Sequence, residues 1–163
     1  MILGLLALLG AQPAVAGAQI QPGIHVTCFI GADKPFGLGI QLPIRGTPRR
    51  NFSAAPTAGL LLTADTILNR GGARFVAAAR YGVGESWNGD WGGHQIIHAE
   101  EIEVGYAMHT QGPNGIHLGT SLSLYVAEVR LHGTYVPRVG AIQDPTAVLA
   151  AGIPVVSMGY SMW

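Results

Sequence analysis

The charged side chains most able to do chemistry in this sequence share one parity within its alternating segments. They are Asp65, Arg74, Arg80, Glu101, Glu103, Glu128 and Arg130. Charges that come together away from water must be paired, because an isolated buried charge is strongly unfavourable. The set contains both signs, so its members can neutralise one another. We interpret it as an ion-pair network inside the fold, and a conducting or ligand-binding interior is the alternative.

Two histidines and a carboxylate, His94, His98 and Glu100, lie on one face of a predicted strand. Residues four apart are neighbours on a helix but are roughly 13 Å apart on a strand. One metal ion cannot join His94 and His98 across that distance. We therefore predict no metal site here.

A second polar group consists of His117, Ser121 and Ser123, which share a strand face. Some barrel enzymes use a histidine and a serine, but the spacing again separates His117 from Ser121 too widely for a direct hydrogen bond. A cross-strand partner such as Glu103 is the alternative contact for Ser121. The sequence also contains no G-x-S-x-G, H-E-x-x-H, CxxC or phosphate-loop motif. We expect polar lining here, with no catalytic residue, metal or cofactor.

The segment that would position these side chains best is 101–109. Its apolar residues Ile102, Val104, Tyr106 and Met108 alternate with Glu101, Glu103, Gly105, Ala107 and His109. A period of two is the pattern of a β-strand with one apolar and one polar or small face.

Similar alternation predicts seven or eight strands. We expect them at 23–30, 37–45, 60–69, 74–83, 95–110, from 115 onward, 146–151 and 153–163, with loops at 46–57, 85–94 and 137–145. Pro43 cannot donate to a ladder, so its strand is expected to be an edge, to be bulged or to end early. The apolar parity changes near Val126, which a β-bulge explains. A tight turn into a new strand is the alternative.

Two turns fix the expected registers. A two-residue turn at Gly71 and Gly72 would place Asn69 beside Arg74 and Asp65 diagonal to Arg80. A three-residue turn at 111–113 would pair Glu103 with Ser121.

Composition limits the class of protein. Formal net charge is zero and charged residues make up 11% of the chain, against roughly 25% in an average soluble domain. A neutral chain is a poor ligand for a phosphate backbone, so we expect no nucleic-acid partner. The single cysteine, Cys28, excludes an internal disulfide.

The first sixteen residues resemble an export signal, because an apolar run is followed by the small-x-small pattern Ala14-Val15-Ala16. The run is too short for a transmembrane helix. We expect residues 1–16 to be a signal peptide and residues 17–163 to form a single β-barrel domain.

The alternation across 24–163 resembles that of small bacterial outer-membrane β-barrel proteins, which also end in an aromatic residue, as Trp163 does here. The resemblance implies an antiparallel up-and-down barrel of about eight strands, located in the bacterial outer membrane and in contact with its lipid. The implied role is non-enzymatic: structural, adhesive or a narrow pore. Trp87 and Trp91, expected in a loop, are candidates for binding a surface partner.

Two alternatives stay open. In a soluble periplasmic or secreted barrel, the faces would invert and a small apolar ligand would occupy a pocket lined by Ile102, Tyr106, Leu118 and Leu122. The second alternative is a membrane-embedded lipid-modifying enzyme.

Overall fold

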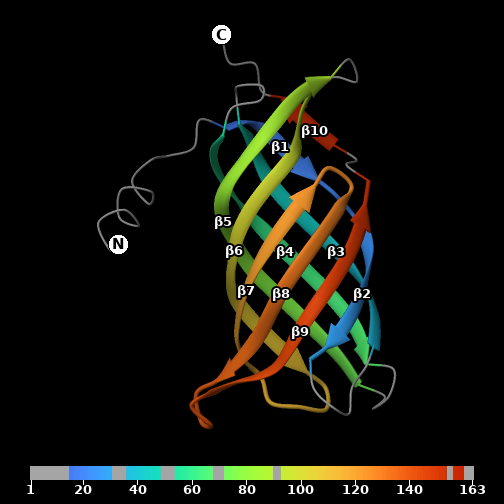
Figure 1. The fold of residues 1–163 in the computed structure, drawn as a ribbon, viewed down its shortest axis with the longest axis vertical. Coiled ribbons are helices and arrows are strands. Elements are labelled where there is room, and N and C mark those ends of the chain that lie inside the picture. The colour runs from blue at the N-terminus through green and yellow to red at the C-terminus, as the bar shows by residue number, and fades with distance from the viewer. Residues whose placement is uncertain are drawn as a thin grey trace, which may run out of the picture.

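The computed structural model describes residues 15–30, 36–48, 54–67, 72–89, 93–153 and 156–159. These residues form an all-β structure of ten strands in one antiparallel sheet (Figure 1). The strands are β1 (Val15–Ile20), β2 (Gly23–Phe29), β3 (Phe36–Pro48), β4 (Ala55–Ile67), β5 (Gly72–Gly89), β6 (Gly93–His109), β7 (Gly115–Leu124), β8 (Ala127–Val136), β9 (Ala141–Gly152) and β10 (Val156–Gly159). Within this part of the chain no helix has the length and apolarity needed to cross a membrane.

The sheet closes on itself through the pairing of β3 with β4. The closed ring runs in spatial order β3, β2, β9, β8, β7, β6, β5 and β4, so its wall has eight strands. β1 and β2 both pair with β3, one after the other along its length. β9 pairs with β2, and β10 pairs with β1. The predicted antiparallel up-and-down barrel of about eight strands is therefore confirmed, and closure leaves the ring no open edge.

Pro43 explains why β1 and β2 are separate strands. Ile20 faces Ile44 and Gly23 faces Gln41, so the same register sets Gln21 opposite Pro43. The Gln21 N–H donates to the Pro43 carbonyl at 3.0 Å. Proline has no N–H to return the bond, so the ladder is interrupted at this pair. The strand that contains Pro43 neither ends there nor lies at an edge, because β3 continues to Pro48 and pairs on both sides.

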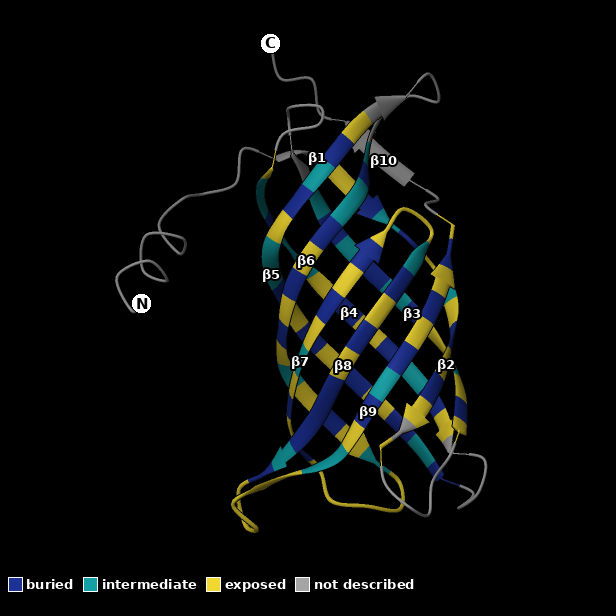
Figure 2. Ribbon diagram, in the orientation of Figure 1, coloured by how far each residue is buried: buried dark blue, intermediate teal, exposed yellow. Residues whose placement is uncertain are grey.

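Burial alternates along the strands, as Figure 2 shows by its stripes of buried and exposed residues. In β7 the pattern BeBeieBeBe buries His117, Ser121 and Ser123 and exposes the intervening leucines. The same parity holds in β6, where Glu101 and Glu103 are buried while Ile102 and Val104 are exposed. The polar face therefore lines the interior and the apolar face forms the outer wall.

Several predicted element boundaries were wrong. Residues 85–89 and 93–94 of the expected loop belong to strands, because β5 extends to Gly89 and β6 begins at Gly93. The loop expected at 137–145 is short, since β9 begins at Ala141. Near Val126 the chain makes a tight turn into β8, the alternative to a bulge, and Tyr125 takes a positive φ of 49° there. The strands expected at 146–151 and 153–163 do not form a hairpin, because β9 pairs antiparallel with β2 and β10 pairs antiparallel with β1.

Both predicted hairpin registers were also wrong. Each was shifted by an even number of residues, so every side chain kept its predicted face of the sheet. Ile67 faces Gly72, so the first connection spans 68–71 and Asp65 lies directly opposite Arg74. In the second hairpin, Tyr106 faces Ile116, and Glu103 faces Gly119 instead of Ser121. The connections are longer than the minimal turns that the glycines suggested. Residues 1–14, most of the expected signal peptide, lie outside the described residues, while Val15 and Ala16 begin β1.

Candidate functional site

The barrel interior gathers all seven charged residues singled out from the sequence. Their exposed fractions range from 1% to 4%: Asp65, Arg74, Arg80, Glu101, Glu103, Glu128 and Arg130. They come from four strands, β4, β5, β6 and β8, because inward parity places them on one face of the closed sheet. The set is therefore a connected lumenal cluster instead of a patch on one hairpin.

Arg80 is the centre of this cluster. Its Nη2 atom lies 2.6 Å from Glu103 Oε1 and 2.6 Å from Glu128 Oε1, and its Nη1 atom lies 3.5 Å from Glu101 Oε2. A guanidinium presents several N–H donors in one plane, so it can bind more than one carboxylate at once. Arg80 thereby links carboxylates from β6 and β8 across the interior.

Arg45 on β3, two strands away from Arg80 in the ring, joins two of the same carboxylates. Its Nε donates to Glu101 Oε2 at 2.9 Å, and its Nη2 lies 2.6 Å from Glu128 Oε2. Arg45 Nη2 also donates to the hydroxyl of Ser123 at 2.7 Å. These bonds cross the lumen from β3 to β6 and β8, so they hold opposite sides of the barrel together.

A second group of charges is centred on Asp65. Arg74 Nη2 lies 2.6 Å from Asp65 Oδ2, as their direct cross-strand pairing requires. The other carboxylate oxygen contacts His25 Nε2 on β2. Arg74 also donates to the Thr146 hydroxyl on β9 at 3.3 Å. This group therefore bridges four strands.

Glycine provides the space that these long side chains need. Gly59 lies in register between Arg45 and Arg80, and Gly39 lies in register between His25 and Asp65. A Cβ at Gly39 would lie 2.7 Å from the Asp65 carboxylate. The interior of an eight-stranded barrel is only wide enough to be filled by side chains, so large residues on one strand need small ones beside them.

The lumenal charges balance. Among the described residues, the buried charged side chains are four arginines and four carboxylates: Arg45, Arg74, Arg80 and Arg130, with Asp65, Glu101, Glu103 and Glu128. With the histidines neutral, this described part of the interior carries no net charge. Because these side chains also leave almost no surface to water, the arrangement can brace the barrel and block passage through it.

The pair His117 and Ser121 is not assembled for nucleophilic catalysis. His117 Nε2 lies 3.0 Å from Glu103 Oε2, but the Ser121 hydroxyl has no hydrogen-bond partner among the described residues. Ser121 faces Glu101 and Arg130 in register, not Glu103. A serine nucleophile needs a base within hydrogen-bonding reach, and this geometry does not supply one.

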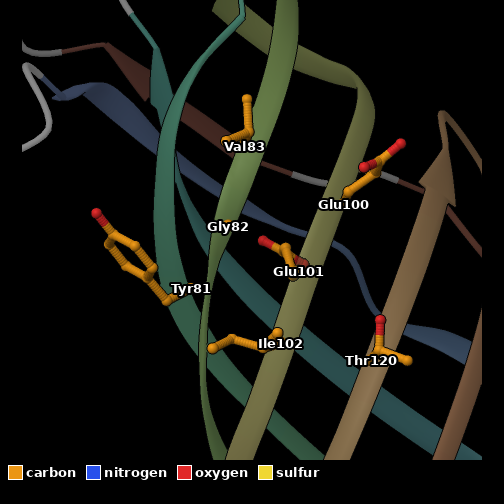
Figure 3. Close-up of a pocket in the computed structure, with 7 residues that line it drawn as sticks. All are labelled: Tyr81, Gly82, Val83, Glu100, Glu101, Ile102 and Thr120. Atoms are coloured by element: carbon orange, nitrogen blue, oxygen red, sulfur yellow. The ribbon is translucent and has the colours of Figure 1, made fainter. Parts of the chain in front are cut away.

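In the soluble alternative, four apolar residues were expected to line an interior pocket. The structure places all four on the outer wall. Ile102 and Tyr106 are 52% and 50% exposed, and Leu118 and Leu122 are also exposed. A hollow of about 350 Å³ has Tyr81, Val83, Glu100, Ile102 and Thr120 among its lining residues (Figure 3). Most of these side chains belong to the outward face, so the hollow opens on the outside of the wall.

The remaining candidates are the two tryptophans and the group His94, His98 and Glu100. Trp87 belongs to β5 and is 43% exposed, and Trp91 lies outside the described residues. His98 Nε2 is 3.7 Å from Glu100 Oε1 on the outer surface. His94 lies in β6, and its side chain is not described.

Sequence reasoning missed Arg45, His25 and His132, which are all buried in the lumen. Parity could have found them, because Arg45 shares the phase of Gln41 and Pro43, and His132 shares that of Glu128 and Arg130. A comparison of the sequence with protein-family models, and of the chain with curated proteins and solved structures, finds no match.

Proposed function

We propose that this chain is a transmembrane β-barrel of the bacterial outer-membrane type, with a structural or adhesive role and a lumen plugged by ion pairs. The observation that carries the proposal is the inverted polarity of the wall. Arginines and carboxylates are buried inside, while large apolar side chains from the ring strands are 37–70% exposed outside. In water such a surface would far exceed the few hundred Å² that monomeric soluble proteins expose.

The length of the apolar wall supports the proposal. On β5 the outward residues from Phe75 to Val83 are apolar. Eight residue steps cover roughly 26 Å along a strand, or about 20 Å along the barrel axis at the usual tilt. Outer-membrane barrels have an apolar band of about 25 Å. The exposed Glu100 and His98 on β6 would then lie beyond one edge of that band.

The plugged lumen favours a structural or adhesive role over a narrow pore. Arg80, Glu101 and Glu103 are each no more than 2% exposed in the middle of the interior. A water-filled channel would leave such side chains accessible along its path. Ions would also have to cross a region in which the fixed charges already satisfy one another.

One experiment tests both parts of this proposal. The purified chain, refolded into phospholipid vesicles, is expected to migrate faster on a gel when unboiled than when boiled, because a closed barrel resists the detergent. The same preparation in a planar bilayer is expected to give no steady conductance. A chain that stays in the aqueous phase with one gel mobility would contradict membrane insertion. A mobility shift accompanied by steady conductance would retain the barrel and contradict the plugged lumen.

A further inference from the structure

Three potential metal ligands meet in the lumen beside the arginine network. They are Glu103 on β6, His117 on β7 and His132 on β8, and one ligand atom from each lies within 4.8 Å of the other two. Glu103 Oε2 and His117 Nε2 are 3.0 Å apart, and the two imidazole rings have centroids 4.7 Å apart. In a tetrahedral zinc site, ligand atoms about 2.0–2.2 Å from the ion lie roughly 3.3 Å from one another. Small side-chain rotations would bring this group to that spacing.

His132 is the residue that points to a missing ligand. It is 8% exposed, and neither Nδ1 nor Nε2 has a hydrogen-bond partner among the described residues. A buried polar group without a partner costs about 1–3 kcal/mol, and native proteins rarely leave one. The neutral imidazole keeps one acceptor nitrogen, which is the atom that binds a metal.

The backbone leaves room between the ligands. Gly119 lies in one register row with Glu103 on one side and His132 on the other. A Cβ at Gly119 would lie 2.8 Å from the His132 Cβ and 3.1 Å from Glu103 Oε2. Any larger residue would therefore push the two ligands apart. The row repeats the arrangement of Asp65, Gly39 and His25 on the other wall, where the acid and histidine are in direct contact.

The chemistry of the three donors selects the class of ion. Two imidazole nitrogens and one carboxylate oxygen suit borderline divalent transition metals, whereas Ca²⁺ and Mg²⁺ prefer all-oxygen sites. Glu103 Oε1 contacts Arg80, whereas Oε2 faces His117 Nε2, and an ion would bind between these two atoms. The positive charge of Arg130, two residues from His132 on the same face, acts against a bound cation, whereas the negative charge of Glu103 favours one.

We propose that Glu103, His117 and His132 form a binding site for a divalent transition-metal ion, with Zn²⁺ as the expected occupant. Three protein ligands leave a fourth position open to water. The site depends only on the barrel and its register. The proposal therefore does not depend on whether the barrel lies in a membrane. An ion there would join β6, β7 and β8 from inside the lumen and satisfy His132.

Metal uptake by the refolded, tag-free chain tests the proposal. The probe is Co²⁺, followed by its visible absorption and by elemental analysis, with Zn²⁺ as competitor. The wild-type barrel is expected to bind about one ion per chain, as a single three-ligand site would. His132→Phe keeps an aromatic ring beside His117 but removes both nitrogens. It should weaken binding by more than about 100-fold, beyond the effect typical of an outer-shell partner.

His98→Ala is the matched control, because His98 lies on the outer surface and should not change uptake. Gel mobility of the unboiled protein shows whether each variant is folded. Zn²⁺ should also raise the urea midpoint of wild type and leave that of His132→Phe unchanged, since an ion that binds only the folded state stabilises it. Uptake by folded His132→Phe equal to wild type, loss of uptake in His98→Ala, or no uptake by folded wild type would overturn the proposal.

Discussion

Replacing Arg80 by methionine is expected to destabilise the barrel by about 3–5 kcal/mol, or to prevent its folding, because a buried ion pair loses one partner. Arg80 binds Glu101, Glu103 and Glu128 together. Its removal leaves three buried carboxylates with one cation fewer, and the lumen gains a net negative charge. Urea-induced unfolding in vesicles, followed by unboiled gel mobility, measures the change.

The matched control is Arg138→Met. Arg138 is an exposed arginine on the turn between β8 and β9, and its loss should change stability by no more than about 0.5 kcal/mol. Adding Glu128→Gln to Arg80→Met should recover part of the loss, because the two residues are in contact and their effects are not additive. Equal urea midpoints for Arg80→Met and wild type would show that the lumenal network does not support the fold.

An arginine in place of Val104 is expected to cost about 2–4 kcal/mol if the outer wall faces lipid, the range for a cation near the middle of a bilayer. Val104 is 51% exposed and lies midway along the outward apolar face of β6. In water the same substitution at a half-exposed position should change stability by only about 0.5 kcal/mol. The free energy of unfolding from vesicles therefore distinguishes the two surroundings.

Gln111→Arg serves as the comparison, because Gln111 is exposed in the connection between β6 and β7 and should tolerate the charge in either environment. If Val104→Arg and Gln111→Arg both leave the unfolding free energy unchanged, the apolar wall is not in contact with lipid. A loss confined to Val104→Arg supports the proposed location.

Parity was the part of the fold that the sequence predicted well. Alternation in 101–109 separated Glu101 and Glu103 from Ile102 and Val104, and the structure buries the first pair and exposes the second. The two wrong registers kept the same faces, because each shift was even. Side-chain direction depends on the backbone pleat alone, so it survives errors in turn length.

Partners across the lumen could not be predicted in the same way. Arg45 meets Glu128 although 83 positions separate them, and this contact depends on ring closure between β3 and β4. The position of Asp65 opposite Arg74 depends on the connection 68–71 being four residues long. The sequence suggested a shorter turn because two adjacent glycines can form one. The grouping of His117 with His132 required the correct register of β7 and β8.

The measurement that tests the central claim most directly is the quenching of a fluorescent probe attached to Val104→Cys in a Cys28→Ser background. Cys28 is the single native cysteine, so this chain carries the probe at one site. In vesicles, we predict strong quenching by lipids brominated in the middle of the acyl chain and little quenching by aqueous iodide. The same probe at Gln111→Cys should show the opposite preference. Iodide quenching at Val104→Cys as strong as at Gln111→Cys would contradict a lipid-facing wall.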